Sequence, residues 1–264
     1  MADTWHHGLV ARWWAEFNLN GPEINYFKKV IQKSGSPALD VGCGTGRILI
    51  PCLEAGIEVH GSDISPEMIH LCQTRLDAQD LVTNLEVVPT HELDLDQKYQ
   101  TIISCGVFGV GTNREEDLEG LKRLQKHLVL GGKLVFDFYL PGENSKEWIT
   151  WAKDYRPTLP SPWSKPKSNK LPDGSDLVLQ TRNIELNTME QYYVKEIRIE
   201  QYKKEILIER YEDKLRLNVY FKNEILLMLK TAGFLQVKVL AGLSDVEPVS
   251  YQDYHLMVIA SNQK

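Results

Sequence analysis

Cysteine is scarce in this sequence, and its spacing excludes two kinds of site. Among 264 residues there are four cysteines, and their positions match neither a zinc site nor a disulfide framework. We expect reduced thiols, packed as small apolar groups in a cytoplasmic protein, and no metal site. The four are Cys43, Cys52, Cys72 and Cys105.

Long hydrophobic runs and an excess of positive charge are also missing. No apolar segment approaches the ~20 residues that a membrane span needs, and residues 1–7 lack the basic and apolar regions of a signal peptide. The formal net charge is −6, whereas a protein that binds nucleic acid needs a basic face to neutralise phosphates. We therefore expect neither a membrane nor a nucleic acid as a partner.

What the sequence does contain is a regular alternation of short apolar segments and helical ones from residue 36 onward. Continuous apolar strands separated by helices form a parallel sheet that is covered on both faces. The pattern predicts a doubly wound α/β fold, in which Gly131 and Gly132 end the helix before the fifth strand. The expected strands are residues 38–41, 57–63, 85–88, 101–105, 133–138, 235–240 and 254–260, and the expected helices are residues 47–55, 65–78, 118–127 and 223–232.

Two parts of the chain depart from this alternation. Helices are expected over residues 5–17 and 22–33, ahead of the first strand. After the fifth strand, residues 151–173 contain five prolines and predict an irregular connection. Apolar and charged residues then alternate, as in an antiparallel sheet with one wet face. The expected inserted strands are residues 177–186, 191–202 and 205–217.

We therefore expect three regions. They are an N-terminal helical cap (residues 1–35), an α/β domain (36–141 and 218–264) and an antiparallel β insertion (142–217). The insertion could serve as a lid, a substrate region or a dimer face.

The strongest local signal is the strand–loop–helix unit that begins at residue 38. Gly42, Gly44 and Gly46 allow a tight turn that brings the backbone close to a ligand, next to the free N–H groups of a helix start. A dinucleotide site uses the spacing G-x-G-x-x-G, but here the spacing is G-x-G-x-G after the acidic Asp40. A carboxylate is a poor neighbour for pyrophosphate, and it suits a ligand that carries an ammonium and a sulfonium.

A second acidic residue ends the next strand. Asp63 lies roughly 20 residues beyond the glycines, where a carboxylate can accept hydrogen bonds from both ribose hydroxyls of an adenosine. Ile64 would then pack against the adenine. The loop and the acid together place an adenosine at the switch region of the sheet, where such folds bind their ligands.

These segments resemble the motifs of class I S-adenosylmethionine (SAM)-dependent methyltransferases. The resemblance lies in residues 39–46 (LDVGCGTG), 61–68 (GSDISPEM) and 127–134 (HLVLGGKL). It implies a Rossmann-like seven-stranded sheet whose last strand is antiparallel, with SAM as the cofactor. It also implies that the glycine loop contacts the amino-acid part of SAM, that the acid at position 63 binds the ribose, and that a residue after the third strand contacts the adenine.

The expected cofactor residues follow from these motifs and from the sheet topology. The turn after the fourth strand should lie near the transferable methyl group, because ligands bind at the carboxyl ends of the strands. The candidates are Asp40, Gly42, Cys43, Gly44, Thr45, Gly46, Asp63, Ile64, Met68, Thr90, His91, Cys105 and Gly106.

The sequence leaves the catalytic residue open. The pair His6 and His7 could reach over the active site as a general base, and His7 is one candidate. Asp137 and Tyr139, at the end of the fifth strand, point toward the same crevice, where either could orient a nucleophile.

Methyl transfer from a sulfonium is an in-line displacement with an activated cofactor, so the protein mainly positions the reactants and excludes water. We predict a SAM-dependent methyltransferase that modifies nitrogen or oxygen of a small molecule. The alternatives are a protein methyltransferase and a non-catalytic SAM-binding protein. A homodimer is also left open.

Overall fold

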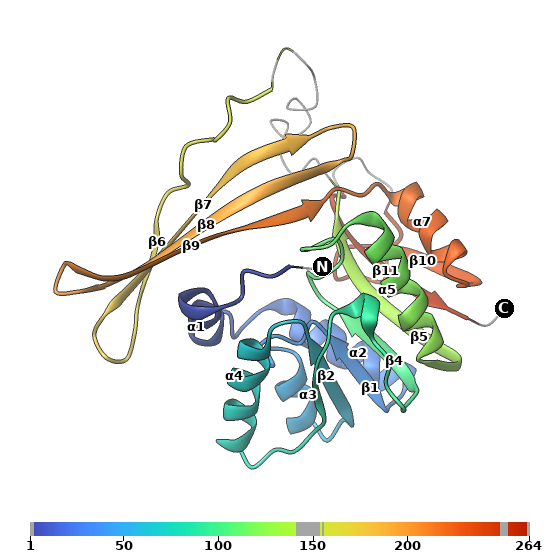
Figure 1. Ribbon diagram of the computed structural model, residues 1–264. Helices are drawn as coiled ribbons and strands as arrows, with labels where there is room; N and C mark the ends of the chain where they lie inside the picture. The colour runs from blue at the N-terminus through green and yellow to red at the C-terminus, as the bar shows by residue number, and fades with distance from the viewer. Residues whose placement is uncertain (1–2, 141–153, 155, 249–252, 263–264) are drawn as a thin grey trace.

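The computed structural model describes residues 3–140, 154, 156–248 and 253–262. Two β-sheets form its frame: a seven-stranded sheet covered by helices, and a four-stranded antiparallel sheet that extends beyond it (Figure 1). The predicted α/β fold with an antiparallel insertion is therefore confirmed.

The seven-stranded sheet has the strand order β10-β11-β5-β4-β1-β2-β3. Strand β11 runs antiparallel to both of its neighbours, whereas the remaining pairs are parallel. The antiparallel last strand implied by the family resemblance is thus confirmed. The strands are β1 (Ala38–Val41), β2 (Val59–Asp63), β3 (Leu85–Val87), β4 (Tyr99–Ser104), β5 (Leu128–Tyr139), β10 (Gln236–Ala241) and β11 (His255–Ser261).

Helices cover both faces of this sheet because successive residues of a strand point to opposite sides. In β4, Ile102 belongs to the core under α5 and α7, while Ile103 belongs to the core under α2, α3 and α4. The helices are α2 (Pro22–Ser34), α3 (Leu49–Glu54), α4 (Pro66–Asp77), the 3-10 turn η1 (Thr90–Glu92), α5 (Arg114–Lys126) and α7 (Lys222–Thr231).

Helix α5 differs most from its expected bounds. It begins at Arg114 because Asn113 forms a capping box with Glu116. The expected start at residue 118 rested on the apolar residues alone, which do not reveal a cap. The prediction that Gly131 and Gly132 end this helix is wrong. The helix ends at Lys126, and the two glycines lie inside β5, where the register against β4 shifts as in a β-bulge.

The insertion has four strands where three were expected. The additional strand, β6, lies in the proline-rich stretch predicted to be irregular, and it pairs only with β7 at the edge of the sheet. Prolines flank it on both sides, which an edge strand tolerates. The strands are β6 (Lys167–Lys170), β7 (Asp176–Asn187), β8 (Tyr192–Lys203) and β9 (Ile206–Asn218).

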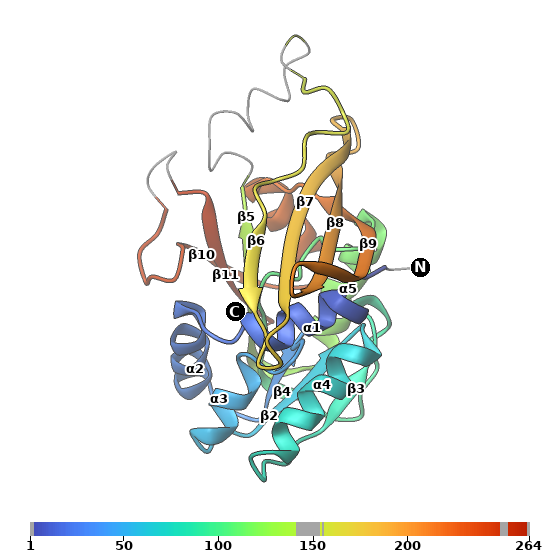
Figure 2. The ribbon, with the colours of Figure 1, turned by 90° about the vertical axis from the view of Figure 1, so that its left-hand side faces the viewer.

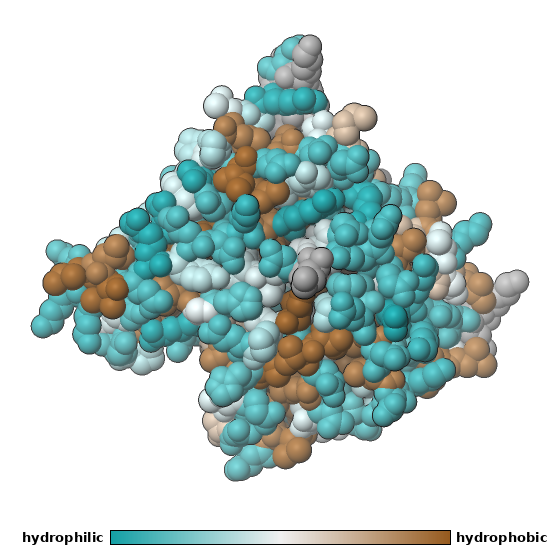
Figure 3. Space-filling model, in the orientation of Figure 1, coloured by the Kyte–Doolittle hydropathy of each residue, from teal (hydrophilic) through white to brown (hydrophobic). Residues whose placement is uncertain are grey.

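Helix α1 (Gly8–Phe17) fills the angle between the two sheets (Figure 2). Its side chains Leu9, Val10 and Trp13 share a core with Ile197 and Ile199 of β8. The β8–β9 hairpin continues past this core, and its far end carries an exposed apolar patch (Figure 3). No helix within the described residues is long and apolar enough to cross a membrane.

Candidate functional site

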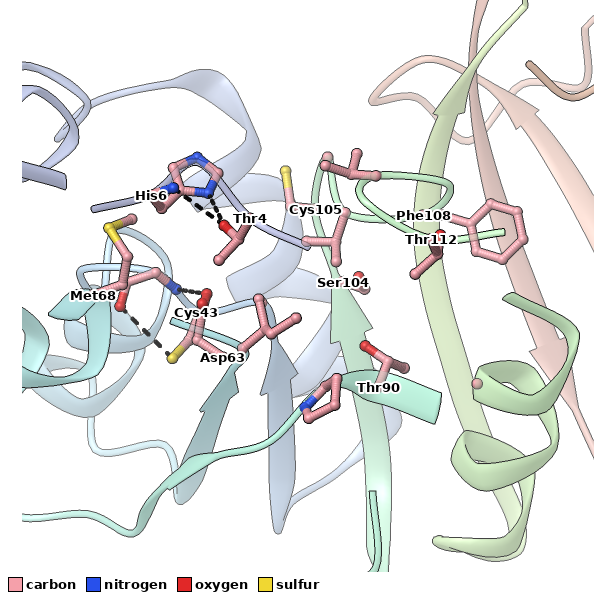
Figure 4. Close-up of a pocket in the computed structure, with 18 of the residues that line it drawn as sticks. Thr4, His6, Cys43, Asp63, Met68, Thr90, Ser104, Cys105, Phe108 and Thr112 are labelled. Carbon is pink, nitrogen blue, oxygen red and sulfur yellow. Dashed lines mark hydrogen bonds between the residues drawn. The ribbon is translucent and has the colours of Figure 1, made fainter. Parts of the chain in front are cut away.

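A cavity of about 460 Å³ opens at the carboxyl ends of β1, β2 and β4. The glycine loop, η1, α5 and the N-terminal segment contribute to its walls (Figure 4). Tyr193, Lys195 and Leu217 of the insertion also line it. We call it the cofactor cavity. Of the predicted cofactor residues, all but Gly46 line it: Asp40, Gly42, Cys43, Gly44, Thr45, Asp63, Ile64, Met68, Thr90, His91, Cys105 and Gly106.

The glycine loop owes its path to backbone conformations that other residues rarely adopt. Gly42, Gly44 and Gly46 have φ values of 71°, 55° and 83°. A Cβ at Gly42 would stand 2.3 Å from the Val107 side chain, so the loop after β4 needs a glycine there. Gly46 packs inward instead, where a Cβ would meet Cys72 at 2.8 Å. Gly46 therefore does not line the cavity, and it contributes by letting the loop pack closely against the helices beneath it.

Two buried carboxyl groups give the cavity its electrostatic character. Asp40 is 2% exposed; burial, and then the charge of Asp63, raises its pKa to about 7. Burial also raises the pKa of Asp63, although three backbone N–H groups oppose the shift. Asp63 accepts hydrogen bonds from the Gly44 N–H at 2.9 Å and the Ser65 N–H at 2.8 Å. A cation in the cavity would favour the ionised form of both groups.

The far end of the cavity holds an unsatisfied polar atom. Nδ1 of His91 is buried and has no hydrogen-bond partner, although buried polar atoms are normally paired. Thr90 lies beside it, against Gly120 of α5. The wall thus combines one acid at the glycine loop, a second acid at the end of β2 and an open hydrogen-bonding position after β3. This set fits the ammonium and sulfonium, the ribose and the adenine of SAM.

The N-terminal segment covers the cavity, which the sequence did not indicate in detail. Its Asp3 N–H donates to the Gly111 carbonyl at 2.8 Å, and the Ser65 hydroxyl donates to the His6 carbonyl at 2.7 Å. The His6 ring contacts the Thr4 hydroxyl at 2.9 Å, and burial lowers the pKa of His6 to about 4, helped by His7.

The structure brings His6, and not the predicted His7, to the cavity wall. His7 stands at the N-cap of α1 and lines no part of the cavity. The sequence pairs the two histidines, and only the start of α1 at Gly8 decides which of them faces inward.

A second cavity, also about 460 Å³, lies between the end of β5 and the inner face of the insertion. It contains the predicted candidates Asp137 and Tyr139. Glu185, Lys195 and Tyr254 line it as well. Nothing in the sequence indicated these three residues as part of a site, because no functional motif was recognised in the segments that carry them. We call it the acceptor cavity.

The two cavities meet at the loop after β4. Six residues line both of them, and they come from this loop and from the strands β8 and β9: Gly106, Phe108, Val110, Tyr193, Lys195 and Leu217. The loop is fixed to β9 by the Gly111 N–H, which donates to the Arg216 carbonyl at 2.8 Å, and by the Asn218 N–H, which donates to the Gly109 carbonyl at 2.8 Å. The insertion therefore shapes the junction directly.

A buried hydrogen-bond network around Asp117 packs against this junction. Asp117 of α5 accepts hydrogen bonds from the hydroxyls of Thr112 and Tyr220 and from the Asn218 amide. Burial raises the pKa of Asp117, and these three donors limit the rise. The Tyr220 ring also packs against Phe108, with ring centroids 5.0 Å apart.

The described part of this site supports neither a cysteine nucleophile nor a metal centre. Burial, and next the charge of Asp137, raises the pKa of Cys105 to about 12, so its thiol carries almost no nucleophilic thiolate at neutral pH. Within the described residues, no group of three histidine, cysteine or acidic side chains is placed to hold a metal ion.

Comparison with known proteins agrees with this geometry. Residues 39–134 match the model of a family described as a methyltransferase domain. An uncharacterized protein of Mycobacterium tuberculosis (strain ATCC 25618 / H37Rv) is 29% identical over 134 residues, 49% of this chain and 46% of the relative. The matched segment thus spans about half the length of this curated relative.

Solved structures match over nearly the whole chain. A SAM-dependent methyltransferase from Clostridium acetobutylicum ATCC 824 has a TM-score of 0.73 at 14% identity, covering 97% of this chain and 98% of its own. The sugar N-methyltransferase KedS8 from Streptoalloteichus sp ATCC 53650 has a TM-score of 0.70 at 17% identity, covering 100% and 94%. At such identities the likeness concerns the fold, including the antiparallel insertion.

Proposed function

We propose that the chain is a SAM-dependent methyltransferase that transfers the methyl group of SAM to an amine nitrogen of a small molecule. The match of residues 39–134 to a methyltransferase-domain model and the fold shared with a solved SAM-dependent methyltransferase support this proposal. The cofactor would lie in the cofactor cavity, with its ammonium and sulfonium near Asp40 and its ribose at Asp63. The amine would lie in the acceptor cavity.

The observation that carries this proposal is the shared wall of the two cavities. Methyl transfer needs the acceptor atom directly behind the methyl carbon, in line with the sulfonium. Gly106 and Phe108 border both cavities. A methyl group presented at this loop would therefore face an acceptor in the neighbouring cavity.

The charges of the acceptor cavity favour an amine. Among the described residues that line it, Asp137 and Glu185 contribute two carboxyl groups and Lys195 one ammonium group, and Tyr139 and Tyr254 add aromatic rings. Carboxylates and tyrosine faces both attract ammonium groups. The sugar N-methyltransferase among the structural neighbours acts on a small-molecule nitrogen, as its name states, which supports the same class for this chain.

An amine must lose its proton before it attacks, and Asp137 is the best placed group to accept it. The carboxyl group is 4% exposed and lies at the junction, where Oδ1 accepts a hydrogen bond from the Gly106 N–H at 2.6 Å. Its remaining lone pairs can receive a substrate N–H. SAM supplies the activated methyl group, and the protein orients the amine and removes its proton.

The test is a panel of amines, amino sugars, phenols, carboxylic acids and peptides, scored by release of S-adenosylhomocysteine. We expect release with amines, and a kcat about 10²-fold lower for Asp137→Asn. Asp96→Asn is the matched control, because Asp96 is exposed and lines neither cavity.

The other outcomes separate the alternatives. Release with phenols or acids alone would identify an oxygen acceptor, and release with peptides alone a protein methyltransferase. If SAM raises the melting temperature and no acceptor is methylated, the protein binds SAM without turnover. A response to NAD and none to SAM would overturn the cofactor assignment.

A further inference from the structure

A histidine on β11 contacts Asp137, one of the two acidic groups described in the acceptor cavity. Nε2 of His255 lies 3.1 Å from Oδ2 of Asp137. The two residues belong to neighbouring antiparallel strands, where His255 stands opposite Tyr139 and Met257 stands opposite Asp137. The contact is therefore a diagonal cross-strand pair, fixed by the register of the sheet.

The imidazole ring is held in place on two sides. It stacks on the Tyr139 ring, with centroids 4.5 Å apart and planes 6° from parallel. Gly242 lies near its other edge, where a Cβ would come within 3.8 Å of Nδ1. The Gly242 N–H donates to the His255 carbonyl at 2.7 Å, which fixes the backbone as well. The ring thus has a defined orientation toward Asp137.

Asp137 links His255 to the junction of the two cavities, because its second oxygen is hydrogen-bonded to Gly106. While Oδ2 faces His255, Oδ1 accepts the Gly106 N–H. A carboxyl group held at both oxygens cannot rotate, so the turn at Gly106 is fixed through it. Gly106 has a φ of 69°, which glycine adopts at no steric cost, so the Asp137 hydrogen bond adds a constraint at a flexible residue.

We propose that His255 is a positioning residue for methyl transfer, a role that rests on the proposed function. Through its hydrogen bond it orients the Asp137 carboxyl group, and through Asp137 it fixes the Gly106 turn against which methyl group and acceptor meet. His255 lines neither cavity. It therefore acts on the reaction only through Asp137 and does not contact the substrate.

Two variants separate hydrogen bonding from packing. His255→Gln keeps an N–H donor at about the distance of Nε2, whereas His255→Phe keeps the stacking on Tyr139 and removes the donor. We expect His255→Phe to lower kcat at least tenfold, with the KM for SAM within twofold of the parent. His255→Gln should recover most of the loss. Equal losses in both variants, or no loss in His255→Phe, would overturn the positioning role.

A second readout does not depend on turnover. Amide hydrogen exchange at Gly106 should accelerate at least tenfold in His255→Phe and remain near the parent rate in His255→Gln. The Gly44 amide, which donates to Asp63, should stay unchanged and serves as the internal control. Faster exchange at both glycines, together with a lower melting temperature, would show general loosening and contradict a specific role.

The two readouts also distinguish this role from the proposed function. If no amine is methylated by the parent protein, the proposed function fails while Gly106 exchange still reports on the His255 contact. If amines are methylated and neither kcat nor Gly106 exchange responds to His255→Phe, the positioning role fails alone.

Discussion

Asp40 and Asp63 stand close enough beside the cofactor cavity for the charge of Asp63 to act on Asp40, and burial together with this charge raises the pKa of Asp40 to about 7. A cationic ligand reverses the balance, because it stabilises the ionised forms of both acids. Binding of SAM near neutral pH is therefore expected to release a proton from Asp40, and this linkage gives the first prediction.

The affinity for SAM should rise about tenfold between pH 6 and pH 8, since below pH 7 Asp40 must first lose its proton and each pKa unit corresponds to a factor of ten. Titration calorimetry at pH 6, in buffers of different ionisation enthalpy, should detect the released proton. The Asp40→Asn variant should bind SAM more weakly and should show neither the pH dependence of affinity nor the proton release. An unchanged pH dependence in that variant would mean that another group titrates.

The same shift predicts how stability without ligand depends on pH. The folded-state pKa of Asp40 lies above its unfolded value, so ionisation costs stability as the pH rises from about 4 to about 7. Asp40→Asn should remove this cost. Urea unfolding should show that the variant gains stability relative to the parent protein as the pH rises from 5 to 8. A constant difference across this range would contradict the expectation.

Asp63→Ala should weaken SAM binding roughly 10- to 100-fold while the protein stays folded, because hydrogen bonds to a charged group contribute about 1.5–3 kcal/mol. The Gly44 and Ser65 N–H groups also lose their acceptor, so the glycine loop should loosen. Asp63→Asn keeps one acceptor oxygen and should have an intermediate effect. Thermal shift with SAM measures all three proteins, and unchanged affinity would refute the ribose role.

Gly111→Ala should open the cover over the cofactor cavity. A Cβ there would stand 1.9 Å from the Asp3 carbonyl oxygen, so residues 3–6 must move. We expect faster dissociation of SAM and faster amide exchange at residues 3–6. Gly56→Ala is the matched control, since Gly56 has a similar φ of 74° against 72° and open space around its Cβ position. Equal effects of the two substitutions would point to backbone strain alone.

Tyr220→Phe should lower the free energy of unfolding by about 1–3 kcal/mol, because a buried carboxyl group loses one of its donors. The Phe108 contact survives the substitution, so SAM affinity should change little. Chemical denaturation and titration with SAM check the two expectations. A large loss of SAM affinity would show that the Asp117 network also shapes the cofactor cavity.

Much of this arrangement could be predicted because its causes are local. The conformation of Gly42 and Gly44 depends on neighbouring residues, so the motif places these glycines correctly. The start of α4 also depends on a local feature, the cap at Ser65, and falls one residue from its expected position. The choice of His6 over His7 depends on where α1 begins. Strand β6 forms because β7 offers a free edge, and the contact of His255 with Asp137 depends on a sheet register that no short motif records. Such contacts between distant segments can be identified only once the three-dimensional fold is known.

The hydrogen bond between Asp3 and Gly111 has a practical consequence for anyone who purifies the protein. An affinity tag inserted directly ahead of Asp3 would adjoin the segment that covers the cofactor cavity. The last strand, β11, instead runs antiparallel to β5 and ends beside Lys133, at the end of the strands opposite the cavity. A tag placed after β11 should therefore leave ligand exchange undisturbed, whereas an uncleaved tag directly ahead of Asp3 should change the measured affinity for SAM.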